Sequence, residues 1–388
     1  MNATPAPAYA AAVNGYAANI KRELARVRSG DGQNASLNNI YHVADANLRY
    51  FFPDLDSMAR EAVLDDVFIQ QRLAFHDESQ FDLIDSTLLD DQAGTLASLE
   101  PGQAHIFCTY HVASYRHVFH FLAAAGIDCL LFMATRSLDS QGKDFLLNAQ
   151  AGAEARGWRG KMATIDAQNS NILLYAARAL KRGTSIIIYI DGNAGVGASS
   201  DNERMAPVSF FGRDIMARTG IGYLSHLANV PIVPMLCTRS ADSGLKMTLH
   251  QPIRPGSTAR DAYAKAATVA LYALLEREIA ARPGMWEGWL FIEKSLKRAP
   301  EAPPQLTGLP AALAPHMMLK ADLEHFALLQ YATQAVLLDK CTHGCIMLDP
   351  ATAATFKAAG QDGTVPAALL SNAGPARLYQ LGALHIAS

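Results

Sequence analysis

The segment Thr184–Asp191, with the sequence TSIIIYID, constrains the fold more than any other stretch of the chain. Its β-branched residues stand at consecutive positions, so both faces of a strand formed here are apolar. A strand buried on both faces needs helices on each side of its sheet, an arrangement typical of parallel sheets. The segment therefore predicts a central strand of an α/β domain.

Other apolar runs of strand length alternate with helical patterns around this segment. The runs are AHIFCTY at 104–110, DCLLFMAT at 128–135, KMATID at 161–166, VPIVPMLCTR at 230–239 and KMTLHQPI at 246–253. The stretches between them that read as helices are 111–126, 143–156, 170–183 and 219–229. The alternation predicts a mostly parallel central sheet flanked by helices.

Changes of pattern divide the 388 residues into four parts. In the first part, the FFPDLD break separates two helical patterns, and Asp54 or Asp56 can cap the second helix. In the last part, QAVLLDKCTHGCIMLD reads as a hairpin followed by a helix. The predicted parts are a helical N-terminal region at 1–84, an α/β domain at 85–298, a Pro-rich linker at 299–318 and a small α+β domain at 319–388.

Charge and composition exclude several classes of function. The formal net charge is −3 and no long basic run occurs, which argues against binding of nucleic acid. The most apolar stretch, at 121–134, is too short to cross a bilayer, and the N-terminus lacks the pattern of a secretory signal. Three of the five cysteines lie in apolar runs, as expected of reduced, buried thiols. We therefore expect a cytoplasmic protein.

The Cys341-Thr-His-Gly-Cys345 cluster has the residue types of a zinc site but lacks a fourth ligand at the usual spacing. A hairpin turn is the favoured interpretation, so the sequence predicts no metal.

Two polar residues follow predicted strands and are candidates for chemistry. His111 comes after the strand at 104–110, and Asp191 ends the strand at 184–191. Ligands of α/β sheets bind at the carboxyl ends of strands, where a histidine can act as a general base and a carboxylate can orient it. The alternatives are a hydrogen-bonded structural histidine and an aspartate that bonds its own turn.

The segment DNERMAPVSFFGRDIMARTG, at 201–220, carries a further set of candidates. The pattern predicts a loop in which arginines stand beside exposed aromatic residues. Arginine binds phosphate or carboxylate groups through paired hydrogen bonds. The candidates here are Glu203, Arg204, Phe210 and Arg213.

Taken in order, five segments resemble the bacterial late lipid A acyltransferases, within the wider lysophospholipid acyltransferase group. The resemblance runs over about residues 40–298. Its segments are NLRYFFPDLDSMAREAV, CTYHVASYRH, GTSIIIYIDGNAG, VSFFGRDIMARTGIGYLSHLANVPIVPM and RPGMWEGWLFIEK.

The resemblance implies transfer of an acyl group from an acyl-carrier-protein or coenzyme A thioester, without a further cofactor. His111 would take the proton of the acceptor's hydroxyl or amine. The family has an acid five residues after this histidine, but the chain has Arg116 there, which cannot accept a hydrogen bond and would oppose the charged imidazolium. Either Asp191 or Glu203 would then replace the acid from another loop, or His111 would act unaided, or the family's reaction would be lost. The other candidates for substrate contact are Tyr110, Ser114, Arg116, Arg204, Phe210 and Arg213.

The acceptor is expected to differ from lipid A, because the membrane anchor of the lipid A enzymes is not found in the chain. Peripheral contact with the inner membrane through the 204–218 region stays open. The C-terminal region faintly resembles the small peptide-binding domains of PqqD type, which would suit a small-molecule, peptide or carrier-bound amino acid acceptor. Two other functions remain: a protein that binds an acyl chain or carrier without catalysis, and a thioesterase.

Overall fold

The computed structural model describes residues 7–30, 34–97, 103–192, 204–240, 242–296, 314–361 and 363–387. The chain divides into two compact units. Residues 19–65 and 289–293 group with the C-terminal region, so this division differs from the predicted boundaries at 84 and 298. Unit 1 comprises Met1–Ala18, Asp66–Gly288 and Lys294–Lys297, and unit 2 comprises Asn19–Asp65, Trp289–Glu293 and Arg298–Ser388.

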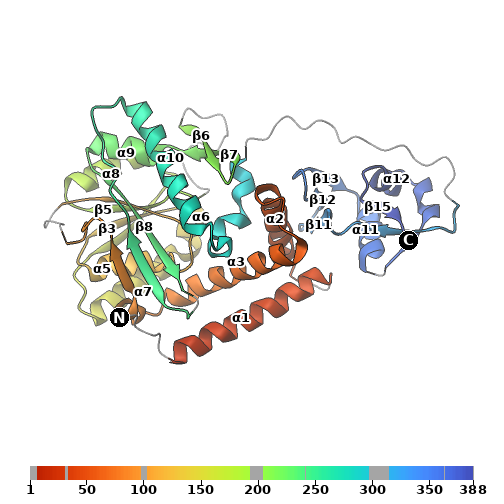
Figure 1. Ribbon diagram of the computed structural model, residues 1–388, viewed down its shortest axis with the longest axis horizontal. Coiled ribbons are helices and arrows are strands. Elements are labelled where there is room, and N and C mark those ends of the chain that lie inside the picture. Colours follow the sequence, from red (N-terminus) through yellow and green to blue (C-terminus); the bar gives the residue numbers. More distant parts are fainter. Residues whose placement is uncertain are drawn as a thin grey trace. The chain divides into compact units, whose positions relative to one another are not determined.

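Unit 1 is built on a seven-stranded sheet in the order β1-β9-β8-β2-β5-β3-β4 (Figure 1). Neighbouring strands are parallel, except that β8 and β9 pair antiparallel. The predicted α/β fold with a mostly parallel sheet is confirmed, and β5 lies inside the sheet, as its two apolar faces require. The strands are β1 (Leu88–Asp91), β2 (Ile106–Thr109), β3 (Cys129–Met133), β4 (Met162–Asp166), β5 (Ser185–Tyr189), β8 (Ile232–Arg239) and β9 (Leu245–Leu249).

Helices pack on this sheet (Figure 1). On α8 the buried residues Ile172, Ala176 and Leu180 recur every four positions, which gives the helix one apolar face toward β5. The helices that lie wholly within unit 1 are α4 (Leu83–Ser86), α5 (His117–Ala124), α6 (Thr135–Ser137), α7 (Lys143–Ala155), α8 (Ile172–Lys181), α9 (Gly220–Ala228) and α10 (Arg260–Ile279). Short helical turns are η1 (Leu138–Gly142), η2 (Pro283–Met285), η3 (Glu287–Leu290) and η4 (Ile292–Ser295).

The segment after β2 differs from the predicted helix at 111–126, because α5 begins only at His117. Val112 forms an antiparallel bridge with Trp286, and the Ala113 N–H donates to the Met285 carbonyl at 2.8 Å. Ala113 has a φ of 45°, which a right-handed helix does not allow. The expectation that His111 opens a helix is therefore wrong, since pairing with a distant segment holds these residues in a loop.

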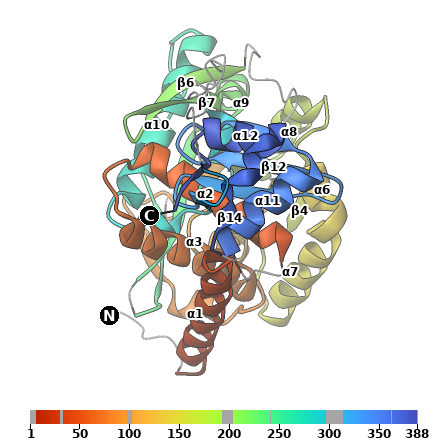
Figure 2. The ribbon, with the colours of Figure 1, turned by 90° about the vertical axis from the view of Figure 1, so that its right-hand side faces the viewer.

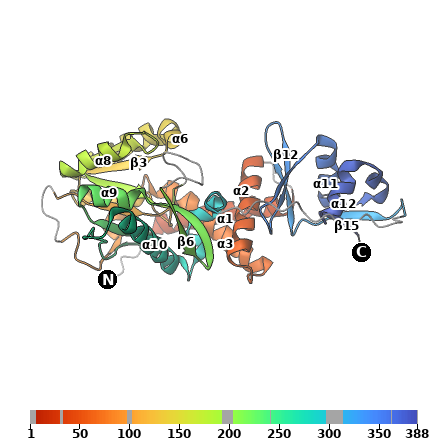
Figure 3. The same cartoon turned by 90° about the horizontal axis from the view of Figure 1, so that it is seen from above.

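The segment 201–220 contains a β-hairpin rather than the loop interpreted from the sequence. Strands β6 (Met205–Phe210) and β7 (Arg213–Arg218) pair antiparallel and are joined by Phe211 and Gly212. The φ angles of these two residues, 46° and 70°, are typical of a type I′ hairpin turn. The hairpin packs through β6 against α10 (Figure 3). Phe210 is fully buried, so the expectation of an exposed aromatic residue is wrong at this position.

Three long helices form the N-terminal part: α1 (Pro7–Arg28), α2 (Ala35–Phe51) and α3 (Ser57–Asp77). The predicted break at FFPDLD is confirmed, and Asp56 caps α3 by accepting a hydrogen bond from the Ala59 N–H at 2.8 Å. Among the helices of the described ranges, none combines the length and hydropathy that a membrane span requires.

The C-terminal region has two small sheets, ordered β14-β10-β15 and β11-β12-β13. The predicted hairpin is the β12–β13 pair, and the predicted helix after it is α11. Figure 2 shows α11 beside β12 and β14. The elements are β10 (Met318–Ala321), β11 (Phe326–Gln330), β12 (Ala335–Asp339), β13 (Cys345–Leu348), α11 (Pro350–Gln361), β14 (Val365–Pro366), η5 (Ala367–Ser371), α12 (Ala373–Gln380) and β15 (Leu384–Ile386).

Candidate active site

His111 and Asp191 follow two neighbouring parallel strands. Thr109 at the end of β2 is in register with Tyr189 at the end of β5. Each strand is followed by one intervening residue before the functional side chain, so His111 and Asp191 come to the same edge of the sheet. This is the carboxyl edge, where α/β sheets bind their ligands.

The Asp191 carboxylate accepts three hydrogen bonds. Its Oδ2 accepts from the His111 backbone N–H at 2.8 Å and from the Trp286 indole Nε1–H at 2.7 Å, and its Oδ1 lies 2.9 Å from Nδ1 of His111. A carboxylate can only accept, so Nδ1 carries the proton in this pair. The Asp191 side chain is 1 % exposed and that of His111 is 21 % exposed. The carboxylate is therefore buried and fixed, while the imidazole reaches the surface.

The pKa of His111 is raised above its ordinary value. Burial lowers this pKa, but the charge and hydrogen bond of Asp191 and the charge of Glu287 together outweigh burial. Arg116 lowers the pKa and is the smallest of these influences. The site thus favours the imidazolium form, which is the form a general base reaches during proton transfer.

Aromatic rings pack around the imidazole. The ring centroids of Tyr115 and Tyr189 each lie 4.8 Å from that of His111. The Tyr189 hydroxyl donates to the Tyr115 carbonyl at 2.9 Å, which ties the two segments together. A Cβ at Gly192 would lie 3.2 Å from the Tyr189 carbonyl oxygen and 3.8 Å from Cε1 of His111. The chain next to Asp191 therefore has little room for a side chain.

The positive charge of Arg116, which lies near His111, is balanced by a neighbouring carboxylate. Its guanidinium donates to the Glu78 carboxylate and stacks over the Phe75 ring, with its central carbon 3.9 Å from the ring centroid. No motif in the sequence points to Glu78 as the partner of Arg116. The expected opposition to the imidazolium is outweighed by Asp191, and the residue is held in place by contacts within unit 1.

Three residues that were predicted to contact substrate have buried side chains. The Tyr110 hydroxyl donates to the Leu271 carbonyl at 2.7 Å, and the side chain is 1 % exposed. Ser114 is fully buried and bonds to both Asp77 and Arg239. Phe210 lies in the core against Trp286, with ring centroids 5.2 Å apart. These positions favour structural roles for Tyr110, Ser114 and Phe210 in place of the predicted substrate contact.

The remaining predicted residues lie on or before the β6–β7 hairpin. Arg204 precedes β6 and is exposed, and its carbonyl accepts hydrogen bonds from the Thr219 N–H and hydroxyl. Arg213 begins β7 opposite Phe210 and is partly buried. Glu203 lies outside the described residues, and the carboxylate that the structure places on His111 is that of Asp191.

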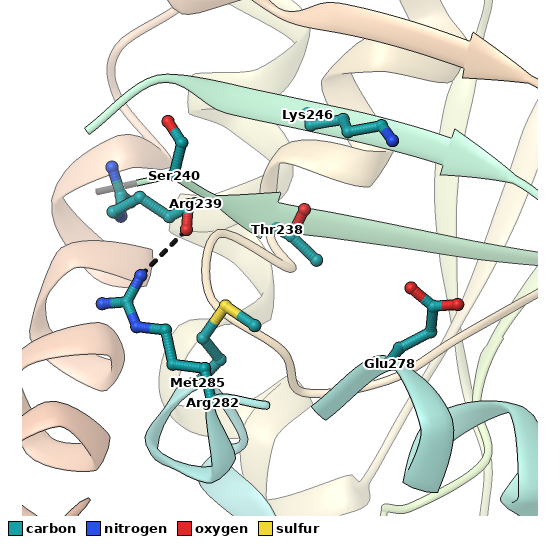
Figure 4. A pocket seen from close by; sticks show the side chains of 7 residues that line it. All are labelled: Thr238, Arg239, Ser240, Lys246, Glu278, Arg282 and Met285. Carbon is teal, nitrogen blue, oxygen red and sulfur yellow. Dashed lines mark hydrogen bonds between the residues drawn. The ribbon is translucent and has the colours of Figure 1, made fainter. Parts of the chain in front are cut away.

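A hollow of about 630 Å³ opens beside η2 (Figure 4). Its three cationic residues are already paired: Arg239 with Asp77, Arg282 with Asp66 and Lys246 with Asp90. Each cation of this lining is therefore already paired with a carboxylate. The lining residues are Thr238, Arg239, Ser240, Lys246, Glu278, Arg282 and Met285.

The Cys341-Thr-His-Gly-Cys345 cluster forms the turn between β12 and β13. Nε2 of His343 lies 2.9 Å from Oδ1 of Asn47 on α2, within unit 2. Lys340 pairs with the buried Asp45 of the same helix at 3.0 Å. The turn thus anchors the C-terminal hairpin on α2. Across the described ranges, no group of three or more His, Cys, Asp or Glu could hold a metal ion.

Part of the chain matches a known protein family. Residues 158–298 match the family described as bacterial lipid A biosynthesis acyltransferase, which confirms the resemblance found in the sequence over that range and supports an acyltransferase in general. The matched range includes Asp191 and Trp286 and begins after His111. No curated protein sequence matches the chain.

One solved structure similar to the chain is the 1-acyl-sn-glycerophosphate acyltransferase PlsC from Thermotoga maritima. The match covers 68 % of this chain and 100 % of that one, with 12 % identity and a TM-score of 0.32.

Proposed function

We propose that this protein transfers an acyl group from a carrier-protein or coenzyme A thioester to a hydroxyl or amine of an acceptor other than lipid A. The observation that carries the proposal is the His111–Asp191 pair at the carboxyl edge of the sheet, with 2.9 Å between Nδ1 and Oδ1. The match to the acyltransferase family over residues 158–298 supports the reaction class.

In the proposed reaction, Nε2 of His111 takes the proton of the acceptor as its oxygen or nitrogen attacks the thioester carbonyl carbon. The new carbon–oxygen or carbon–nitrogen bond forms and the carbon–sulfur bond breaks. The leaving thiolate then receives the proton from the imidazolium. Asp191 holds the Nδ1–H tautomer and stabilises the imidazolium, which is the role of the acid in comparable pairs.

Two other residues position this pair. The Trp286 indole donates to Asp191 and fixes one oxygen, which leaves the other for His111. Glu78 holds the charge of Arg116, so the arginine that replaces the family's acid leaves Asp191 as the dominant charge on His111. This arrangement favours an enzyme over a binding protein that has lost its chemistry.

The test is the products formed from a panel of acyl thioesters, carrier-bound and coenzyme A-bound, offered with an alcohol or an amine and analysed by mass spectrometry. An acyltransferase yields the ester or amide, a thioesterase yields the free acid, and a binding protein yields neither. The variants are His111→Gln and, as a matched control, His325→Gln, which disrupts an exposed His–Asp pair with 2.8 Å between Nδ1 and Oδ2 of Asp322. Product formation that His111→Gln leaves unchanged would refute the role of His111.

A further inference from the structure

The carboxylate of Asp77, the last residue of α3, binds side chains from three other segments of unit 1. Its Oδ1 accepts a hydrogen bond from the Tyr9 hydroxyl of α1 at 2.7 Å. Its Oδ2 accepts hydrogen bonds from the Ser114 hydroxyl and from the guanidinium of Arg239 on β8. Arg239 also donates to the hydroxyl oxygens of Tyr9 and Ser114. These four residues form the Asp77 network, and each of them is at most 7 % exposed.

The Asp77 network contains a buried ion pair, and such a pair adds little to stability. The side chains of Asp77 and Arg239 are 0 % and 2 % exposed. The attraction between two buried charges is offset by the hydration that both lose, and apolar side chains of similar volume often give equal or greater stability. What hydrogen-bonded charges add is direction, because each donor must point at its own oxygen. The network therefore fixes the position of Ser114 more narrowly than apolar packing would.

Ser114 lies in the loop that carries His111 and ends where α5 begins. The φ of 45° at Ala113 keeps this stretch out of a helix, so contacts with other segments determine its path. The hydroxyl of Ser114 binds Asp77, and the next residue, Tyr115, packs its ring on the imidazole with 4.8 Å between the ring centroids. The bond to Asp77 therefore fixes the backbone directly before the ring that contacts His111.

We propose that Asp77 is a positioning residue for His111. Through its bond to Ser114, it holds the Tyr115 ring against the imidazole. The Tyr9 hydroxyl in turn holds Asp77, and because burial raises the pKa of Tyr9, this hydroxyl stays protonated near neutral pH and donates. A ring packed on the imidazole limits its rotation, so Nε2 keeps one direction toward the acceptor. The effect on rate rests on the proposed acyl transfer, but the effect on the contact between the two rings does not.

Two variants each remove one hydroxyl from the Asp77 network. Ser114→Ala releases the loop from Asp77 and leaves the ion pair of Asp77 with Arg239 in place. Tyr9→Phe keeps the aromatic ring and removes the bond to Oδ1 of Asp77. Because phenylalanine fills the space of Tyr9, this variant tests the proposal even if Ser114→Ala fails to fold.

Ser225 on α9 and Tyr263 on α10 provide matched controls. Both are buried in unit 1, and their hydroxyl oxygens lie 2.8 Å apart. The Ser225 hydroxyl also donates to the Val230 carbonyl at 2.6 Å. Ser225→Ala and Tyr263→Phe therefore remove the same chemical groups from a buried serine–tyrosine contact outside the His111 loop.

The contact between the two rings is measured by NMR on the whole chain, from nuclear Overhauser effects between the ring protons of His111 and Tyr115. These effects should be lost in Ser114→Ala and weakened in Tyr9→Phe, and both controls should keep them. The double variant should equal Ser114→Ala, since both hydroxyls act on His111 through one path. Effects that stay unchanged in Ser114→Ala or in Tyr9→Phe would overturn the proposal, as would an equal loss in the controls.

Thiol release separates this inference from the proposed function. If wild type turns over an acyl thioester, kcat of Ser114→Ala should fall about ten- to hundredfold with KM unchanged, because a shift of about 1 Å in a positioned group can lower the rate by about 10²-fold. Ser225→Ala should keep the wild-type kcat. An unchanged kcat in Ser114→Ala would overturn the positioning role while acyl transfer stands. If no thioester is turned over, the proposed acyl transfer fails, and the ring contact still decides whether Asp77 positions His111.

Discussion

Replacing Asp191 with asparagine is expected to trap His111 in the wrong tautomer. Both the Trp286 indole and the His111 backbone N–H donate to Oδ2, so the single oxygen of asparagine must take that place. The amide nitrogen then occupies the position of Oδ1, 2.9 Å from Nδ1 of His111. Because an amide nitrogen only donates, Nδ1 must accept and the ring proton moves to Nε2. The nitrogen that would take the acceptor's proton is then blocked.

The size of the effect follows from this geometry. Loss of the correct tautomer in a His–Asp pair lowers kcat by roughly 10⁴, so thiol release by Asp191→Asn should fall by about three to four orders of magnitude. The pKa of His111 should drop below its ordinary value, because burial lowers it and the main opposing charge is gone. Two of the three hydrogen bonds to the side chain survive, so the fold should persist.

The assay combines thiol release with nitrogen-15 NMR of labelled histidine, which reports the tautomer and the pKa of His111. The double variant His111→Gln/Asp191→Asn should be no slower than His111→Gln alone, because residues that act as one unit are not additive. Asp191→Asn with activity within about tenfold of wild type, or with the proton still on Nδ1, would show that Asp191 does not set the tautomer on which the reaction depends.

Three more outcomes follow from the same contacts. Burial lowers the pKa of His117 to about 3, so below about pH 6.5 the unfolded chain binds a proton at this residue that the folded chain does not. The free energy of unfolding therefore falls as the pH is lowered. In urea titrations at pH 5 to 7, His117→Gln should reduce the slope of this fall by up to about 1.4 kcal/mol per pH unit. Arg239→Met leaves the buried Asp77 without its cation and should cost about 3–5 kcal/mol in chemical denaturation, and a loss below 1 kcal/mol would contradict the ion pair. Trp286→Phe removes one neutral donor from the Asp191 carboxylate and should cost about 1.5–3 kcal/mol of stability, and an unchanged midpoint would show that the indole bond is not formed.

The sheet was predictable from the sequence because its strands are local signals. The apolar runs at β2, β5 and β8 are long and β-branched enough to be recognised without their neighbours. The β6–β7 hairpin was not predicted, since its turn is Phe211-Gly212 rather than the Asn-Gly pair that usually marks such turns. The start of α5 was predicted wrongly because the Val112–Trp286 bridge joins segments far apart in the chain.

The His–Asp pair of the candidate site was predictable from the sequence, but the residues that support it were not. His111 and Asp191 each follow a strong strand, so parallel register brings them to one edge. The roles of Trp286 and Glu287 were not predicted, because their segment forms no regular strand. Its pairing with residues 111–113 joins parts of the chain far apart and produces no hydrophobic periodicity that the sequence would show. The buried positions of Tyr110 and Ser114 likewise depend on partners in α10, α3 and β8 that only the fold brings close.

The pH dependence of thiol release shows whether His111 is the general base. His111 must be neutral to take a proton, and its pKa is raised, so kcat/KM should fall on acidification with a midpoint above pH 6.5. The midpoint should coincide with the pKa of His111 measured by NMR in the same protein. A rate that stays constant while His111 titrates would contradict the account, because the imidazole would then not be the base.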